Sequence, residues 1–158
     1  MRHPLVMAHG PEHHFLVPAV LLTVAKSSGC PDLNLPEALT IALERSRNVL
    51  GGFCGYYGAC GGQVGAGIFM SILTDATPLS EEGFALANEV TGSGLVMLSS
   101  FGGPRCCKRS VFTALQNASK FSNQKLGTTI ELPERILCPF FPQNHECIQV
   151  RCPYFPQR

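Results

Sequence analysis

The sequence predicts a mainly α-helical protein: a single domain of about five helices, followed by an irregular C-terminal tail rich in proline and cysteine. Apolar residues recur at helical spacing in successive segments, and glycine or proline separates each segment from the next. Prolines at positions 139, 142, 153 and 156 exclude a regular element in the tail. We therefore assign residues 1–158 to one domain and residues 137–158 to its tail.

The first two helices are predicted from their start and stop signals. Pro11 suits the first helical position, and apolar residues then follow at helical spacing, so we expect a helix over about 11–26. Asn34 and Glu37 form a capping pair at the start of a second helix, which the glycines at 51–52 end.

Three further helices and one short strand are predicted after the glycine-rich centre of the chain. A very apolar segment over about 64–73 reads as a buried helix. Ser80 is the expected N-cap of a fourth helix that runs to about Ser99. A fifth helix is expected over about 105–121, and residues 128–132 suggest a short strand.

Composition limits the classes of partner and the compartment. Only 15% of the residues are charged and the formal net charge is +1, which argues against nucleic acid or an anionic membrane as the main partner. The longest apolar run, residues 15–25, is too short to span a bilayer, and polar residues interrupt any secretion signal. We therefore expect a cytoplasmic protein, whose eight cysteines hold metal or perform redox chemistry rather than form disulfides.

Seven of the eight cysteines fall into three local groups, and Cys30 is left as a core or loop thiol. The first group is Cys54 and Cys60, which lie in a glycine-rich segment that can curl closely around a compact anionic group. Cys60 is expected at the amino end of the third helix, where the helix dipole favours a thiolate. A tight turn with incidental cysteines is the competing interpretation.

The second group is the sequence Gly-Gly-Pro-Arg-Cys-Cys-Lys-Arg at 102–109. With Pro104 as the first helical residue, Cys106 and Cys107 would both lie in the first turn, flanked by three positive side chains. A helix start and neighbouring cations lower a thiol pKa, so a metal ligand or a nucleophile is expected here. Neighbouring helical residues point about 100° apart, so the two cysteines should differ in role, and one of them is expected to pack in the core.

The third group is Cys138, Cys147 and Cys152 in the tail, and we interpret residues 137–158 as a segment that wraps around a metal centre. Cysteine followed by proline, as at 138 and 152, recurs in iron–sulfur proteins, although the spacing matches no ferredoxin pattern. His145 offers a fourth ligand for a zinc site, but zinc ligands usually lie closer together in sequence.

A histidine-rich segment, His-Gly-Pro-Glu-His-His at 9–14, precedes the first helix. Glu12 and His13 are candidate catalytic groups there, together with Cys106 and Cys107, although a surface histidine cluster is the commoner meaning of such a segment. The residues expected to bind a cofactor are Gly61, Gly62, Gly102, Gly103 and Arg105. The expected metal ligands are Cys54, Cys60, Cys106, Cys107, Cys138, Cys147 and Cys152.

These motifs, Cys-Gly-Tyr-Tyr-Gly-Ala-Cys-Gly-Gly at 54–62, the 102–109 sequence, the histidine-rich opening and the Cys-Pro tail, resemble an uncharacterised cysteine-rich domain family of anaerobic bacteria and archaea. The resemblance covers nearly the whole chain. It implies an anaerobic setting and a redox or S-adenosylmethionine-dependent enzyme as partner, since members occur fused to S-adenosylmethionine-dependent enzymes. It carries no activity over to this chain.

Three functions compete at this stage. The first is an iron–sulfur protein, with an expected four-iron cluster and a redox or sulfur-handling role. If only the three tail thiolates held the cluster, one iron would be open to substrate. The second is a thiol-relay enzyme in which Cys106 or Cys107 reacts and Cys54 or Cys60 resolves. The third is a binding module whose tail is stapled by zinc and which docks onto a methyltransferase or radical enzyme.

Overall fold

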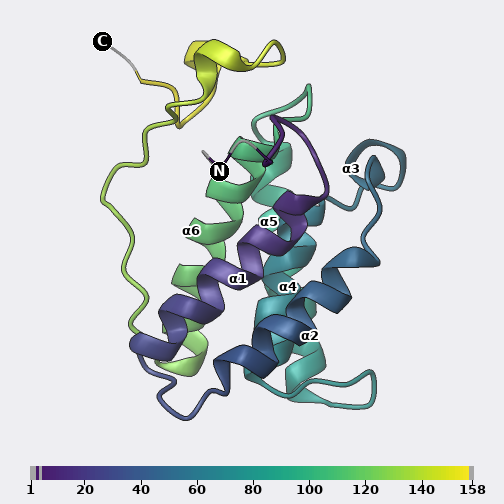
Figure 1. The fold of residues 1–158 in the computed structure, drawn as a ribbon, viewed down its shortest axis with the longest axis vertical. Coiled ribbons are helices and arrows are strands. Elements are labelled where there is room, and N and C mark those ends of the chain that lie inside the picture. The colour runs from purple at the N-terminus through teal and green to yellow at the C-terminus, as the bar shows by residue number, and fades with distance from the viewer. Residues whose placement is uncertain (1–2, 4, 157–158) are drawn as a thin grey trace.

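The computed structural model describes residue 3 and residues 5–156 (Figure 1). This part of the chain contains helices and no strand: α1 (Glu12–Ser27), α2 (Leu35–Arg47), α3 (Phe53–Tyr56), α4 (Gly61–Leu73), α5 (Glu82–Ser99), α6 (Cys107–Leu126), and two single-turn 3₁₀ helices, η1 (Phe141–Gln143) and η2 (Gln149–Arg151). None of the helices in the described residues has both the length and the apolar character that a membrane span needs.

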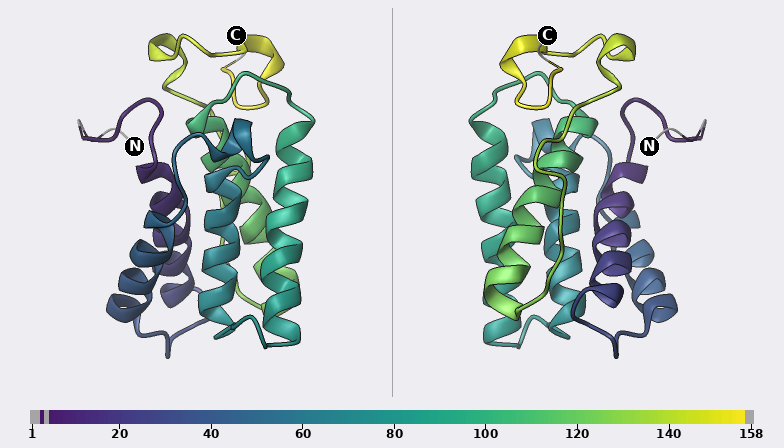
Figure 2. Two further views of the ribbon diagram at one scale, coloured as in Figure 1. Left: turned by 90° about the vertical axis from the view of Figure 1, so that its right-hand side faces the viewer. Right: turned by 90° about the vertical axis from the view of Figure 1, so that its left-hand side faces the viewer.

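The bundle is organised around α4, which packs against all of the other long helices, α1, α2, α5 and α6 (Figures 1 and 2). Burial explains why the sequence of α4 is almost free of polar residues: Phe69 and Met70 are fully buried in the core, and Gln63 is the only fully buried polar side chain of the helix. A helix surrounded by other helices has no solvent face to keep polar.

Glycines let the backbone of α4 approach its neighbours closely. A Cβ added at Gly65 would lie 2.8 Å from His14 O and 3.0 Å from Pro18 Cδ, both on α1. A Cβ added at Gly67 would overlap the hydroxyl of Thr91 on α5. The glycine content that interrupts the apolar pattern of α4 is therefore a packing requirement.

The chain after α6 turns back and runs along the bundle to the end where α6 begins (Figures 1 and 2). Ile130 is fixed against α6, because its carbonyl accepts from Ser119 Oγ at 2.8 Å and Asn123 Nδ2 at 2.9 Å, and its N–H donates to Asn123 Oδ1 at 2.9 Å. Side chains of α6 thus make the hydrogen bonds to this backbone that a neighbouring strand would make in a sheet. The predicted strand over residues 128–132 is therefore wrong.

The single-domain helical architecture is confirmed, with corrections at helix ends. The last long helix begins at Cys107 with Cys106 as its N-cap, not at Pro104. The N-cap of α5 is Glu81; Ser80 Oγ instead accepts from the N–H of Thr77 at 2.9 Å. The short helix α3 inside the glycine-rich segment was not predicted, because four residues are too few to show a periodic pattern.

Candidate functional site

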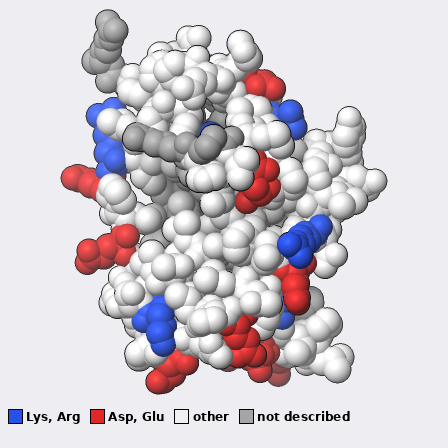
Figure 3. Space-filling view, viewed as in Figure 1, with Lys and Arg blue, Asp and Glu red and all other residues white. Residues whose placement is uncertain are grey.

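Two cavities lie at the end of the bundle where α4 and α6 begin. The smaller is formed between the start of α6 and the tail, and the larger lies between the α3 segment, the end of α5 and the starts of α4 and α6. Only Cys106 and Arg109 line both cavities. Positive and negative side chains are interspersed on the face of the molecule seen in Figure 3.

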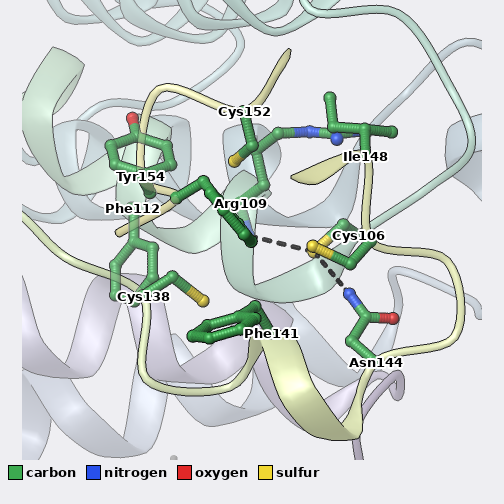
Figure 4. Close-up of a pocket in the computed structure, with 11 residues that line it drawn as sticks. Cys106, Arg109, Phe112, Cys138, Phe141, Asn144, Ile148, Cys152 and Tyr154 are labelled. Atoms are coloured by element: carbon green, nitrogen blue, oxygen red, sulfur yellow. Dashed lines mark hydrogen bonds between the residues drawn. The ribbon is translucent and has the colours of Figure 1, made fainter. Parts of the chain in front are cut away.

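Four cysteines line the small cavity: Cys106 from α6 and, from the tail, Cys138, Cys147 and Cys152. Figure 4 shows Cys106, Cys138 and Cys152 around Arg109. Aromatic side chains, including Phe112 of α6, close the cavity, and its free volume is about 10 Å³, the room of one water molecule. The sequence placed three of these thiols together, and the fold adds Cys106 as the fourth.

Hydrogen bonds and aromatic packing dock the tail on α6. Tyr154 is 3% exposed, and its hydroxyl contacts Gln116 Oε1 at 2.6 Å and Thr113 Oγ1 at 3.1 Å. The ring of Tyr154 meets Phe112 edge-on at 5.3 Å, and its carbonyl accepts from Cys138 N–H at 2.7 Å. The tail thus has a fixed position at the start of α6, which explains how a segment rich in proline is ordered.

Cys106 is held by polar contacts on both sides. As the N-cap of α6, its Sγ accepts from the N–H of Arg109 at 3.4 Å, and Asn144 Nδ2 donates to the same sulfur at 3.3 Å (Figure 4). Asn144 also contacts His9 Nε2 at 3.0 Å through Oδ1, which ties the tail to the N-terminal segment. His9 pairs with Glu146 at 2.9 Å, and this hydrogen bond lowers the pKa of the Glu146 carboxyl.

Two buried cations flank the four thiols. Lys108 and Arg109 are each 4% exposed, and neither has a carboxylate within 4.0 Å among the described residues. Lys108 Nζ donates to Met7 O at 3.1 Å and to His13 Nε2 at 2.7 Å. It also lies 5.1 Å from the centre of the Phe140 ring. Buried lysine and arginine are rare without a partner of opposite charge, so these two require an explanation.

Arg109 connects the two cavities. Its Nη2 donates to the carbonyls of Gly102 and Pro104, at 3.0 and 2.6 Å, and so holds the loop that walls the large cavity. Its Nε is buried and has no hydrogen-bond partner in the described residues. A buried N–H without an acceptor costs roughly 1–3 kcal/mol, which is recovered when an acceptor such as a sulfur ligand occupies the cavity.

Burial changes the acidity of three thiols that line the cavities, Cys107, Cys138 and Cys152. It raises the pKa values of Cys138 and Cys152, and nearby thiols, Cys106 and Cys147, raise them further. Burial also raises the pKa of Cys107. The expected lowering of the pKa at the start of α6 is therefore wrong for Cys107, because desolvation outweighs the helix dipole and neighbouring cations. A bound metal ion reverses this balance, since its positive charge stabilises thiolates.

The large cavity has a volume of about 840 Å³ and contains the remaining candidate thiols, Cys54, Cys60 and Cys107. All five residues expected to bind a cofactor line it: Gly61, Gly62, Gly102, Gly103 and Arg105. No aspartate or glutamate does. The sequence-predicted metal ligands are thus divided between two cavities, with Cys106 facing both.

The two candidate groups of the histidine-rich segment have different surroundings. His13 lines the large cavity, but its Nδ1–H donates to Gly10 O at 3.0 Å and its Nε2 accepts from Lys108. Burial, followed by the charge of Lys108, lowers the pKa of His13 to about 4, so the imidazole is neutral at pH 7. Glu12 lines neither cavity; its Oε1 lies 3.6 Å from His13 Nδ1.

Two side chains of the site have little or no signal in the sequence. Asn144 contacts Cys106 across a large sequence separation, which no local pattern reveals. His14 becomes notable only because its ring packs against Gly61. His145, offered as a fourth ligand of the tail, is exposed and does not line the small cavity. Among the described residues, no three His, Cys, Asp or Glu side chains are grouped closely enough to hold one metal ion.

Comparison with protein-family models identifies the chain. The model of DUF5714, a family of unknown function, matches residues 1–155. The chain belongs to this family. The DUF5714 match spans the helical bundle, both cavities and nearly all of the tail, so the two cavities described here belong to one family domain. No curated protein and no solved structure matches the chain.

Proposed function

We propose that the protein is an iron–sulfur protein that holds a four-iron cluster between α6 and the tail, with the ligands Cys106, Cys138, Cys147 and Cys152. The observation that carries this proposal is that four thiols line one small cavity together with the buried Arg109. Lys108, the residue before Arg109, is also buried, and neither cation has a carboxylate partner among the described residues. The described tail residues contribute three of the thiols, and the N-cap of α6 contributes the fourth.

Charge supports an anionic centre at this place. Four thiolates around a doubly positive four-iron core leave two negative charges, which Lys108 and Arg109 balance. Without the cluster, the two cations have only neutral partners in the described residues: carbonyls, an imidazole and an aromatic ring. An uncompensated buried charge costs several kcal/mol, so a counter-charge in the cavity stabilises the fold.

The ligand set favours a redox role. Four protein thiolates complete the coordination of the cluster, whereas three would leave an iron open to substrate as a Lewis acid. The N–H of Arg109 and the amide of Asn144 already donate to Cys106 Sγ, and hydrogen bonds to sulfur ligands raise cluster potentials. We further propose a cytoplasmic setting, because all eight cysteines are free thiols.

Cluster binding requires the tail to move. A four-iron core is larger than the free volume of about 10 Å³, so the tail shifts outward when the core enters. The contacts of Tyr154 and Asn144 with the bundle must rearrange in this movement. Binding of the core and closure of the tail are then one coupled event.

Iron and acid-labile sulfide analysis of protein purified without oxygen tests the proposal. Wild-type protein should contain equal amounts of iron and sulfide, near four of each per chain. Cys138→Ser should lose most of both, whereas Cys54→Ser, which alters an exposed thiol of the large cavity, should keep them. Stoichiometric zinc without sulfide would overturn the proposal in favour of a zinc-stapled tail. Unchanged iron in Cys138→Ser would overturn the ligand assignment.

A further inference from the structure

The large cavity contains three thiols that the proposed metal centre does not use: Cys54, Cys60 and Cys107. Cys60 is the N-cap of α4, Cys107 is the first residue of α6, and both line the cavity. The first turns of these helices are in direct contact: a Cβ added at Gly62 would lie 3.4 Å from Ser110 Cβ, and Gln63 Nε2 donates to Ser110 O at 3.1 Å. The two cysteines therefore occupy adjoining helix ends.

Cys60 and Cys107 line the same cavity from the adjoining starts of α4 and α6. Cys60 is 7% exposed and Cys107 is partly buried, whereas Cys54, which also lines this cavity, is exposed on α3. Cys60 and Cys107 are thus the two less exposed thiols of the large cavity that the proposed metal centre does not use.

His14 has a ring nitrogen without a hydrogen-bond partner on the Cys60 side of this pair. Its Nδ1–H donates to Val49 O at 2.8 Å, and the described residues provide no hydrogen-bond partner for Nε2. The ring lies so close to Gly61, which follows Cys60, that a Cβ at this position would overlap it. A thiol near an imidazole whose other nitrogen is fixed is the arrangement that activates a cysteine.

The size and charge of the cavity indicate a small anionic ligand. A volume of about 840 Å³ lies within the range of small-molecule sites, roughly 300–1,000 Å³. Arg105 and Arg109 line the cavity, and no aspartate or glutamate among the described residues does. The amino end of α4 also faces the cavity, since Cys60, Gly61 and Gly62 line it.

We propose that the large cavity binds a small disulfide bearing carboxylates and that Cys60 and Cys107 reduce it by thiol–disulfide exchange. His14 Nε2 takes the proton of Cys60, and the thiolate attacks one substrate sulfur. The substrate S–S bond breaks, and the first half leaves as a thiol with the proton from His14. A mixed disulfide between Cys60 and the second half remains.

The second exchange completes the reaction. Cys107 attacks Cys60 Sγ, and its proton goes to the departing second half of the substrate. The substrate is reduced to two thiols while Cys60 and Cys107 are oxidised to one disulfide, and the reverse exchange with a dithiol restores the pair. This activity does not require the proposed metal centre.

Bis(carboxymethyl) disulfide and cystamine test the proposal, because they are disulfides of similar size and opposite charge. Reduced protein is incubated with each probe without oxygen, and its digest is analysed by mass spectrometry. We expect a Cys60–Cys107 disulfide in the wild type, formed about tenfold faster with the anionic probe. Cys107→Ser should trap a carboxymethylthio adduct on Cys60, and Cys107→Ala provides the same trap if the serine variant fails to fold.

Cys54→Ser is the matched control and should still form the Cys60–Cys107 disulfide. An adduct confined to Cys54, or a disulfide between other cysteines, would overturn the assignment of the pair, and equal rates with both probes would overturn the substrate class. Cys138→Ser separates this proposal from the metal centre: it should lose iron and still form the disulfide. Cluster binding without exchange would contradict only the thiol reaction, and exchange in a wild type without iron would contradict only the metal centre.

Discussion

Cys106 and Cys107 are consecutive residues, yet Cys106 lines the small four-thiol cavity and Cys107 lines only the large cavity. The backbone explains the separation. Cys106 is extended at φ −148° and ψ 107° as the N-cap, and Cys107 is the first helical residue. The change from extended to helical backbone between these two residues thus directs the Cys106 thiol into the small cavity and the Cys107 thiol away from it. The proposed metal centre and the proposed thiol exchange can therefore be altered separately by mutation.

Lys108→Met should lower the reduction potential of the proposed cluster. Removing a positive charge destabilises the more negative reduced state. At a separation of ~8 Å and an effective dielectric constant of about 20, the interaction is about 2 kcal/mol, or roughly 90 mV for one electron. A redox titration followed by visible absorption measures the shift. Lys125→Met, on the exposed face of α6, is the control, and an equal shift in that variant would contradict a local effect of Lys108.

His13→Gln should reduce the loss of stability at acid pH. The pKa of His13 is 6.5 in the unfolded chain and about 4 in the fold. The unfolded state therefore binds more protons in this interval, so the stability contributed by neutral His13 is complete above pH 6.5 and declines as the pH falls toward 4. The wild type should lose roughly 2 kcal/mol more than His13→Gln between pH 7 and pH 5 in urea unfolding. Parallel pH profiles for the two proteins would refute this role.

Alkylation by iodoacetamide should discriminate between the thiols of the large cavity. Cys54 is exposed and should be modified first. Burial raises the pKa of Cys107, so its rate should rise about tenfold per pH unit from neutral pH to beyond pH 9 as the thiolate fraction grows. Peptide mass spectrometry after short exposures gives both rates. Modification of Cys107 as fast as Cys54 at pH 7 would show that the thiol is not desolvated.

Gly65→Ala and Gly92→Ala should have opposite effects on stability. An added Cβ at Gly65 meets the backbone of α1 at 2.8 Å, so α1 and α4 must separate, at a cost of about 1–3 kcal/mol. Gly92, inside α5, has nothing within 4 Å of its added Cβ, and alanine there should stabilise by roughly 0.5–1 kcal/mol. Denaturant unfolding compares the two. A stabilised Gly65→Ala would contradict the close packing of α1 on α4.

Local signals in the sequence were sufficient for the helices and insufficient for some of their ends. Asn34 is the N-cap of α2 as predicted, and its Nδ2 donates to Glu37 Oε2 at 2.9 Å. Pro104 was taken as a helix start because proline suits that position, but the structure begins α6 three residues later. The residues at 128–132 have the composition of a strand without a partner strand beside them, and tertiary contacts with α6 decide their conformation.

The sequence was sufficient to predict which residues belong to the site, but not how those residues are arranged in space. The sequence identified the clustered cysteines but left open which of them meet. The union of Cys106 with the tail depends on the return of residues 127–137 along α6, a path that no local pattern encodes. The raised pKa of Cys107 could not be predicted from the sequence either, because desolvation depends on which parts of the folded chain cover the thiol.

The path of that return segment also sets an order of events during biosynthesis. A ribosome releases the start of α6 well before the tail, and N-terminal parts of a chain fold first. The start of α6, with Cys106, therefore leaves the ribosome before the tail cysteines that line the same cavity in the folded chain. If the proposed cluster were inserted during synthesis, it would bind Cys106 first, and the tail cysteines would then complete its ligand set.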